Sequence, residues 1–239
     1  MRVIRVALVG FVALLLTPLA AAAQGAASEP RQNSQFDFYV LSLSWSPSFC
    51  AAAAERNPAQ GGGAECTGKP TGKSYGFIVH GLWPQFETGF PEYCENPAPR
   101  LDRGLVAVML DLMPAPRLIF NEWDRHGTCS GLSPRAYFDT VRRARAAVKI
   151  PADYAEPRAA LTVTPGAVAA AFIAANPGLS NAAIAIACDD KRLTGVRICL
   201  NKDLSAGAQF HDCAEVAKRG CRREQLVMPG AAGPHGGNS

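Results

Sequence analysis

The run from Asn121 to Cys129 has an unusual density of side chains that can do chemistry; it reads Asn-Glu-Trp-Asp-Arg-His-Gly-Thr-Cys. In a helix, Glu122 and His126 are four residues apart and therefore share one face. Arg125 lies beside them, and Gly127 suits the left-handed residue that ends a helix. A carboxylate, an imidazole and a guanidinium on one turn are suited to binding an anion and to transferring protons.

A second run of this kind begins at His80, where His-Gly-Leu-Trp-Pro follows a short apolar segment. Two imidazoles can cleave a phosphodiester without a metal, because one removes a proton from the nucleophile and the other donates a proton to the leaving oxygen. A cation such as Arg125 would stabilise the charge that builds on the phosphoryl oxygens. If the nucleophile is the neighbouring ribose 2′-OH, the substrate is RNA and DNA is excluded. Trp83 could stack on a base, or it could be a half-buried core residue.

A rival interpretation is a zinc site in which His80, Glu122 and His126 hold a metal-bound water as the nucleophile. The spacing Glu-x-x-x-His differs from the His-Glu-x-x-His motif, and the neighbouring Arg125 would repel a divalent cation. We therefore predict a reaction that needs no metal or other cofactor. His211, next to an aspartate and near a cysteine, is expected to have a structural role.

The N-terminal residues predict export. Arg2 and Arg5 precede an apolar stretch, and three alanines ending at Ala23 resemble a cleavage site. The apolar stretch is too short for a stable membrane anchor, and no later stretch is long enough for one. The mature protein is therefore expected not to be anchored in a membrane. We predict a monomer that is periplasmic or secreted. Its parts are a signal peptide at 1–23, a flexible leader at 24–35, one domain at 36–228 and a flexible tail at 229–239.

Apolar periodicity predicts strands and helices that do not strictly alternate, which indicates the α+β class. Phe36–Trp45 alternates as a strand, and Phe77–Val79 is a short buried strand that ends at His80. The segments 50–73 and 86–100 are expected to be loops. Helices are expected over 101–112, 117–126, 134–148 and 165–176, and further strands over 183–188, 195–200 and 208–213.

Eight cysteines in an exported chain predict four disulfides, although counting alone allows about 105 pairings. A zinc site built from cysteines is less consistent with the sequence, because no Cys-x-x-Cys pair occurs. The formal net charge of +4 is compatible with a polyanionic substrate but does not by itself indicate one.

Both reactive runs resemble the active-site segments of one family, the ribonuclease T2 family. Phe77-Ile-Val-His-Gly-Leu-Trp-Pro84 is similar to the first segment, and Glu122-Trp-Asp-Arg-His-Gly-Thr-Cys129 to the second. The resemblance extends to the strand at Phe36–Trp45 and to the C-terminal cysteine pattern. It implies an α+β fold with an antiparallel sheet packed with helices. It also implies an endoribonuclease that acts by transesterification through a 2′,3′-cyclic phosphate.

The resemblance also implies a role for each residue of the two segments. His126 would be the general base on the 2′-OH and His80 the general acid for the 5′-oxygen. Glu122 and Arg125 would stabilise the pentacoordinate phosphate, and Trp83 would help to hold a base. The family pattern further implies the disulfides Cys50–Cys66, Cys94–Cys129, Cys188–Cys221 and Cys199–Cys213.

The chain departs from the family pattern at two positions. Residue 121 is Asn where the family usually has His, so it can bond a phosphate or sugar oxygen but cannot supply charge. Arg125 replaces a lysine, which keeps the charge and changes its geometry from a point to a fork. Base preference is expected to be broad. Asn121 alone favours the alternative of a non-catalytic relative that binds RNA or a protein partner on the same scaffold.

Overall fold

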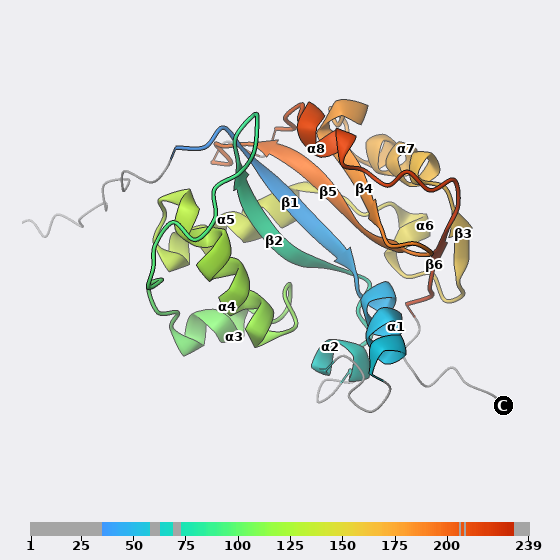
Figure 1. Cartoon of the computed structure of the whole chain (residues 1–239), viewed down its shortest axis with the longest axis horizontal. Coiled ribbons are helices and arrows are strands. Elements are labelled where there is room, and N and C mark those ends of the chain that lie inside the picture. Colours follow the sequence, from blue (N-terminus) through green and yellow to red (C-terminus); the bar gives the residue numbers. More distant parts are fainter. Residues whose placement is uncertain (1–34, 58–62, 69–72, 206, 208, 232–239) are drawn as a thin grey trace, which may run out of the picture.

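The computed structural model describes residues 35–57, 63–68, 73–205, 207 and 209–231. At its centre is a four-stranded antiparallel sheet with the order β2-β1-β5-β4 (Figure 1). A two-stranded antiparallel sheet, β3-β6, lies near one end. The strands are β1 (Phe38–Trp45), β2 (Phe77–Gln85), β3 (Leu161–Val163), β4 (Ile184–Cys188), β5 (Leu193–Asn201) and β6 (Leu226–Met228).

Helices surround the sheet, which confirms the predicted α+β class. Figure 1 shows α3 and α4 beside the β2 edge and α7 beside β4. None of the helices in the described ranges is long and apolar enough to cross a membrane. The helices are α1 (Ser46–Arg56), α2 (Ala64–Thr67), α3 (Arg103–Met109), α4 (Pro116–Arg125), α5 (Pro134–Ala147), α6 (Ala152–Ala155), α7 (Pro165–Ala175) and α8 (Ala214–Lys218), with short 3-10 helices η1 (Gly127–Ser130) and η2 (Asn181–Ala183).

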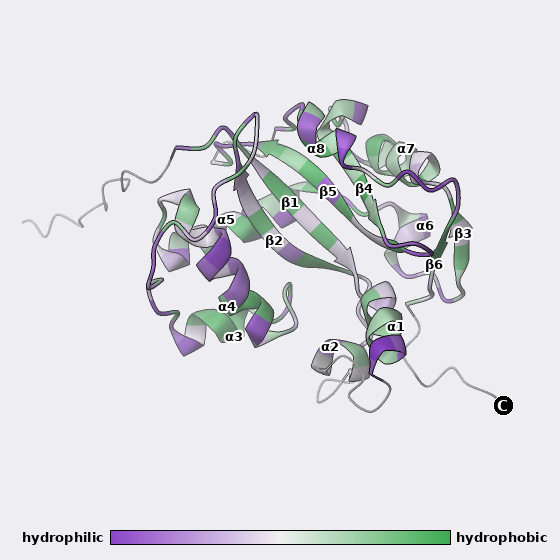
Figure 2. Cartoon of the chain, in the orientation of Figure 1, coloured by the Kyte–Doolittle hydropathy of each residue, from purple (hydrophilic) through white to green (hydrophobic). Residues whose placement is uncertain are grey.

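The main hydrophobic core covers one face of the sheet. Successive strand residues point to opposite faces, and the alternation along the strands is visible in Figure 2. In β1, Leu41, Leu43 and Trp45 all belong to this core and are almost fully buried. The hydroxyl of Tyr137 on α5 donates to the carbonyl of Leu82 on β2, which ties the helix to the sheet from the core side. The opposite face of β1 and β2 is therefore left to carry polar groups.

An irregularity in β2 determines which residues reach that opposite face. Leu43 pairs with Val79 and Ser42 pairs with Gly81, so His80 is an extra residue without a partner on β1. Because of this bulge, Val79 belongs to the core and His80 is only partly buried. The sequence interpretation ended this strand at His80 and was wrong, since β2 continues to Gln85. Pro84 is tolerated there because β2 is an edge strand.

Two other predictions were wrong for local reasons. Residues 50–73 were expected to be a loop, but α1 begins at Ser46 with Pro47 in its first turn, where proline favours a helix rather than ending one. A strand was expected over 208–213, but the only pairing there in the described chain is a single bridge between Phe210 and Leu200. The short sheet β3-β6 was not predicted.

The predicted flexible tail begins too early. Trp45 Nε1 donates to the carbonyl of Pro229 at 2.9 Å, and the amide of Ala231 donates to the carbonyl of Pro157 at 2.7 Å. The chain is therefore held against the body through Ala231. The predicted signal peptide, almost all of the leader and the last eight tail residues, 232–239, lie outside the described residues.

All four disulfides implied by the family resemblance are present. They are Cys50–Cys66, Cys94–Cys129, Cys188–Cys221 and Cys199–Cys213. Cys94–Cys129 joins the segment after β2 to η1, which directly follows α4. The C-terminal end of α4 is thereby fixed by a covalent bond as well as by packing.

Candidate active site

Helix α4 carries one half of the site and is anchored by the residue between its functional side chains. Trp123 is buried, packs against Tyr137 and donates from Nε1 to the carbonyl of Pro99 at 2.8 Å. With Trp123 turned into the core, Glu122 and His126 share the face of the helix that meets the sheet. Both are only 6 % exposed.

Gly81 on β2 lets α4 come close to the sheet. A Cβ atom at this position would overlap the carboxylate of Glu122 and would lie 2.6 Å from Nε1 of Trp83. Only glycine leaves the space that the carboxylate fills. The helix therefore places Glu122 directly over the strand that carries His80 and Trp83.

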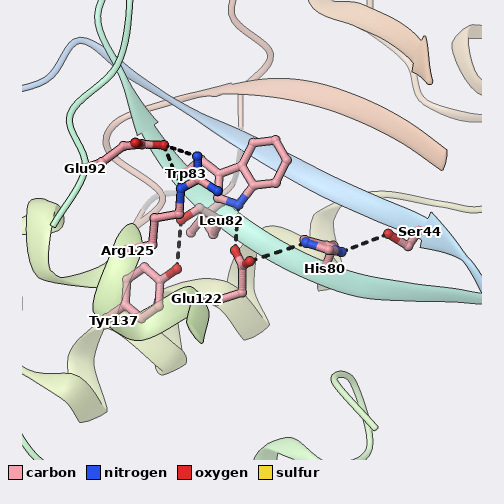
Figure 3. Close-up of polar contacts among 8 residues, drawn as sticks. All are labelled: Ser44, His80, Leu82, Trp83, Glu92, Glu122, Arg125 and Tyr137. Carbon is pink, nitrogen blue, oxygen red and sulfur yellow. Dashed lines mark hydrogen bonds and ion pairs between the residues drawn. The ribbon is translucent and has the colours of Figure 1, made fainter. Parts of the chain in front are cut away.

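The Glu122 carboxylate is at the centre of a chain of polar contacts, shown in Figure 3. Trp83 Nε1 donates to Oε2 at 2.7 Å, and His80 Nε2 lies 3.3 Å from Oε1. On the other side of the imidazole, His80 Nδ1 is 3.1 Å from the hydroxyl of Ser44 on β1. Both ring nitrogens of His80 thus have a partner, and the ring is fixed in orientation although its side chain is 41 % exposed.

His126 is in a different environment from His80. Its Nδ1 is buried and has no hydrogen-bond partner in the described part of the chain. Its ring centroid lies 5.3 Å from that of Trp83. Burial lowers the pKa of His126 to about 4, an effect that the negative charge of Glu122 opposes only in part. At neutral pH the imidazole is therefore uncharged and able to accept a proton.

Five of the six predicted site residues line one pocket of about 340 Å³. They are His80, Trp83, Glu122, Arg125 and His126. Arg125 Nε donates to Glu92 Oε1 at 2.6 Å, and this bond raises the pKa of the guanidinium. The site thus contains an uncharged imidazole, a second imidazole beside a carboxylate, and a paired cation.

Asn121 does not line that pocket. It faces a neighbouring hollow of about 570 Å³, whose lining also includes Ser44, His80 and Leu118. His80 is shared between the two cavities and stands at their junction. The arrangement leaves room for one group on each side of the His80 imidazole.

Several pocket residues were not predicted from the sequence. Phe90 lines the pocket and is 41 % exposed. Arg197 enters the pocket from β5, and Arg219 from the end of α8. The sequence signal that could have identified one of them is at Arg197, which is a charged residue between Val196 and Ile198 in a largely apolar strand.

The zinc alternative named His80, Glu122 and His126 as ligands. Within the described ranges, no group of three or more His, Cys, Asp or Glu side chains is arranged to hold a metal ion. His80 and Glu122 instead contact each other, Trp83 and Ser44.

Comparison with known proteins gives consistent matches. Residues 36–213 match the sequence model of the Ribonuclease T2 family. The chain is 38 % identical over 121 residues to a ribonuclease of Aeromonas hydrophila, covering 50 % of this chain and 48 % of that protein. It is 27 % identical over 169 residues to ribonuclease I of Escherichia coli K12, and the match covers 57 % of this chain and 63 % of that protein. The chain thus spans about half the length of the first of these relatives.

Solved structures share the fold. RNase NT, crystallised with 5′-AMP, has a TM-score of 0.58 at 24 % identity and covers 82 % of this chain and 98 % of its own. An RNase-related protein from Calystegia sepium has a TM-score of 0.60 at 18 % identity, and the match covers 81 % of this chain and 97 % of that protein. At these identities the likeness concerns the fold alone.

Proposed function

Because the chain belongs to the ribonuclease T2 family, we propose that it is a metal-independent endoribonuclease of broad base preference. It cleaves RNA by attack of a ribose 2′-OH and leaves a 2′,3′-cyclic phosphate. The observation that carries this proposal is the pairing of an uncharged, buried His126 with a His80 that lies 3.3 Å from the Glu122 carboxylate. In this proposal the mature protein is an exported monomer.

His126 is the general base in this reaction. Its lowered pKa keeps it uncharged at neutral and weakly acidic pH, so it can take the proton of the 2′-OH. The bond from the 2′-oxygen to phosphorus then forms. Glu122, which favours the charged form of His126, stabilises the imidazolium that results.

His80 is the general acid on the other side of the phosphate. The bond from phosphorus to the 5′-oxygen breaks as this oxygen takes the proton of the His80 imidazolium. Glu122 Oε1 lies 3.3 Å from Nε2 and would stabilise the protonated ring, while Ser44 holds the opposite nitrogen. His80 borders both cavities, which supports a leaving nucleoside in the hollow lined by Asn121 and an attacked nucleotide in the pocket lined by His126.

Arg125 and Trp83 have supporting roles in the proposal. Arg125 supplies positive charge to the phosphoryl oxygens, and its bond to Glu92 positions the guanidinium at the pocket edge. Trp83 holds Glu122 through its indole N–H and offers part of its ring to a base. Asn121 contacts the substrate from the neighbouring hollow without adding charge.

Incubating the purified mature protein with RNA in EDTA, followed by mass analysis of the product ends, tests the proposal. Fragments that end in 2′,3′-cyclic phosphates are expected. Intact RNA in EDTA with cleavage after zinc is added would favour a metal-dependent hydrolase. RNA that is bound but intact in both conditions would favour a non-catalytic relative and would make Asn121 the first position to restore to histidine.

The pKa of His126 predicts the pH dependence of the reaction. Since a base must be unprotonated to act, the acid limb of the kcat/KM profile is expected below about pH 4, and not near the ordinary histidine value of 6.5. The same shift makes the folded state lose stability as the pH falls from 6.5 to about 4, because the unfolded chain takes up this proton first. Rate profiles on a dinucleotide and thermal unfolding at matched pH measure both. An acid limb centred near 6.5 would contradict the assignment.

A further inference from the structure

Two arginines enter the pocket from the side opposite α4. Arg197 lies on β5, where it pairs in register with Ser42, and its guanidinium lies over the Trp83 ring at 5.5 Å from the ring centroid. Arg219 follows α8 and lies over the exposed ring of Phe90 at 5.9 Å. Both line the pocket that holds His126. Positive charge therefore gathers at an end of the pocket that the proposed cleavage step does not use.

Neither arginine forms an ion pair among the residues that the structure describes, whereas Arg125 pairs with Glu92 and Arg142 with Asp111. Lys218 and, less strongly, the charge of Arg219 lower the pKa of Glu215 one turn earlier on α8, so the arginine without an acidic neighbour is Arg197. The Nε of Arg197 is buried and has no hydrogen-bond partner there. Burial lowers the pKa of Arg197, and the charge of Arg219 lowers it further.

A partly buried guanidinium without an anion is costly to keep in a folded protein, because its lost hydration is not replaced. Binding of an anion in the pocket would offset this cost. The fork of an arginine matches the oxygens of a phosphate in particular, since two parallel N–H groups can bond two oxygens. The distribution of charge thus indicates a phosphate, in a pocket already proposed to hold a nucleotide.

We propose that Arg197 and Arg219 form a second phosphate subsite, which binds the phosphate on the 5′ side of the attacked nucleotide. The choice of side rests on the proposed function. His126 removes the 2′-proton and lines only the Trp83 pocket, so the attacked nucleotide lies there and the leaving nucleoside lies beyond His80. The next phosphate within the same pocket is then the 5′-phosphate of the attacked nucleotide. Contacts of this kind fix the register of a nucleic acid without reading its sequence.

Binding of deoxydinucleotides tests the subsite without requiring cleavage, because they lack the 2′-OH. Calorimetry at neutral pH and about 150 mM salt, which screens long-range attraction, compares dApdA with and without a 5′-phosphate. The 5′-phosphate is expected to lower Kd about tenfold in the unaltered protein, the scale of one charge-assisted contact. Arg197→Gln is expected to reduce this preference to about twofold, and Arg197→Lys to keep part of it because a point charge replaces the fork.

Arg135→Gln is the matched control, since it removes one charge at an exposed position that lines neither cavity; it should leave the preference intact. A 3′-phosphate on dApdA should improve binding less than a 5′-phosphate does. Equal gains from both ends, a preference unchanged in Arg197→Gln, or no binding of the 5′-phosphorylated form would each overturn the subsite. RNA cleavage is measured separately and reports on the proposed function. A protein that prefers the 5′-phosphate but leaves RNA intact would contradict the proposed function and not the subsite.

Discussion

His126→Ala is expected to lower kcat for RNA cleavage by about 10²–10⁴-fold, the usual contribution of a positioned general base. The imidazole is buried in the pocket and uncharged at neutral pH, and its removal takes away the group proposed to accept the 2′-proton. The fold should survive, because Nδ1 has no hydrogen bond to lose in the described chain. Initial rates on a dinucleotide, with thermal unfolding in parallel, separate the two effects.

His211→Ala is the control for His126→Ala. His211 stacks on Phe38 with ring centroids 4.5 Å apart, bonds Glu87 and does not line either cavity. It fills the structural role that the sequence predicted, so its loss is expected to affect stability more than rate. If His126→Ala kept most of its activity while remaining folded, another group would have to be the base.

Gly81→Ala is expected to lower kcat about 100-fold, the scale of a displacement of about 1 Å at a catalytic group. The added methyl overlaps the Glu122 carboxylate and approaches Trp83 Nε1, so the carboxylate must leave its present position between Trp83 and His80. Overpacking should also cost about 1–3 kcal/mol of stability. Rates and the free energy of unfolding, measured on the same preparations, show whether the loss of rate exceeds what partial unfolding explains.

The matched control is Gly166→Ala on α7, where an added Cβ meets nothing within 4 Å. It should not change the rate, and alanine should stabilise the helix by up to about 1 kcal/mol. A double-mutant cycle isolates the mechanism, because Gly81→Ala in a Glu122→Ala background has no carboxylate left to displace. If Gly81→Ala lowered kcat as much in the Glu122→Ala background as in the unaltered protein, the clash with Glu122 would not be the cause.

The sequence predicted the helix of the candidate site well because its signals are local. α4 was expected over 117–126 and spans Pro116–Arg125, with Glu122 and His126 on the face toward the sheet. The helices expected over 134–148 and 165–176 also begin where predicted, at Pro134 and Pro165. The hydroxyl of the residue before each proline, Ser133 or Thr164, accepts a backbone N–H three residues ahead and caps the helix. Spacing, caps and proline positions are read within one turn of the chain and need no tertiary contact.

The remaining features depend on contacts between distant segments. Ser44 is an ordinary polar residue in an alternating strand until β2 places His80 beside it. Arg197 and Phe90 enter the pocket only because β5 and the segment after β2 meet at Trp83. The extension of β2 was missed because Gly81 and Pro84 suggest a turn locally, although one makes room for Glu122 and the other is accepted at a sheet edge.

The bulge at His80 also limits which insertions and deletions this strand can tolerate. In a regular strand, residues three apart point to opposite faces, yet His80 and Trp83 both reach the pocket because one extra residue interrupts the pairing with β1. Removing one residue between them would place the imidazole and the indole two residues apart, so a strand without the bulge would still present both on the pocket face. Adding one residue beside the retained bulge would instead turn the indole toward the core, where Val79 and Leu82 now pack. In alignment and grafting, the interval His-x-x-Trp can therefore lose one residue together with the bulge, but it cannot gain one while the bulge remains.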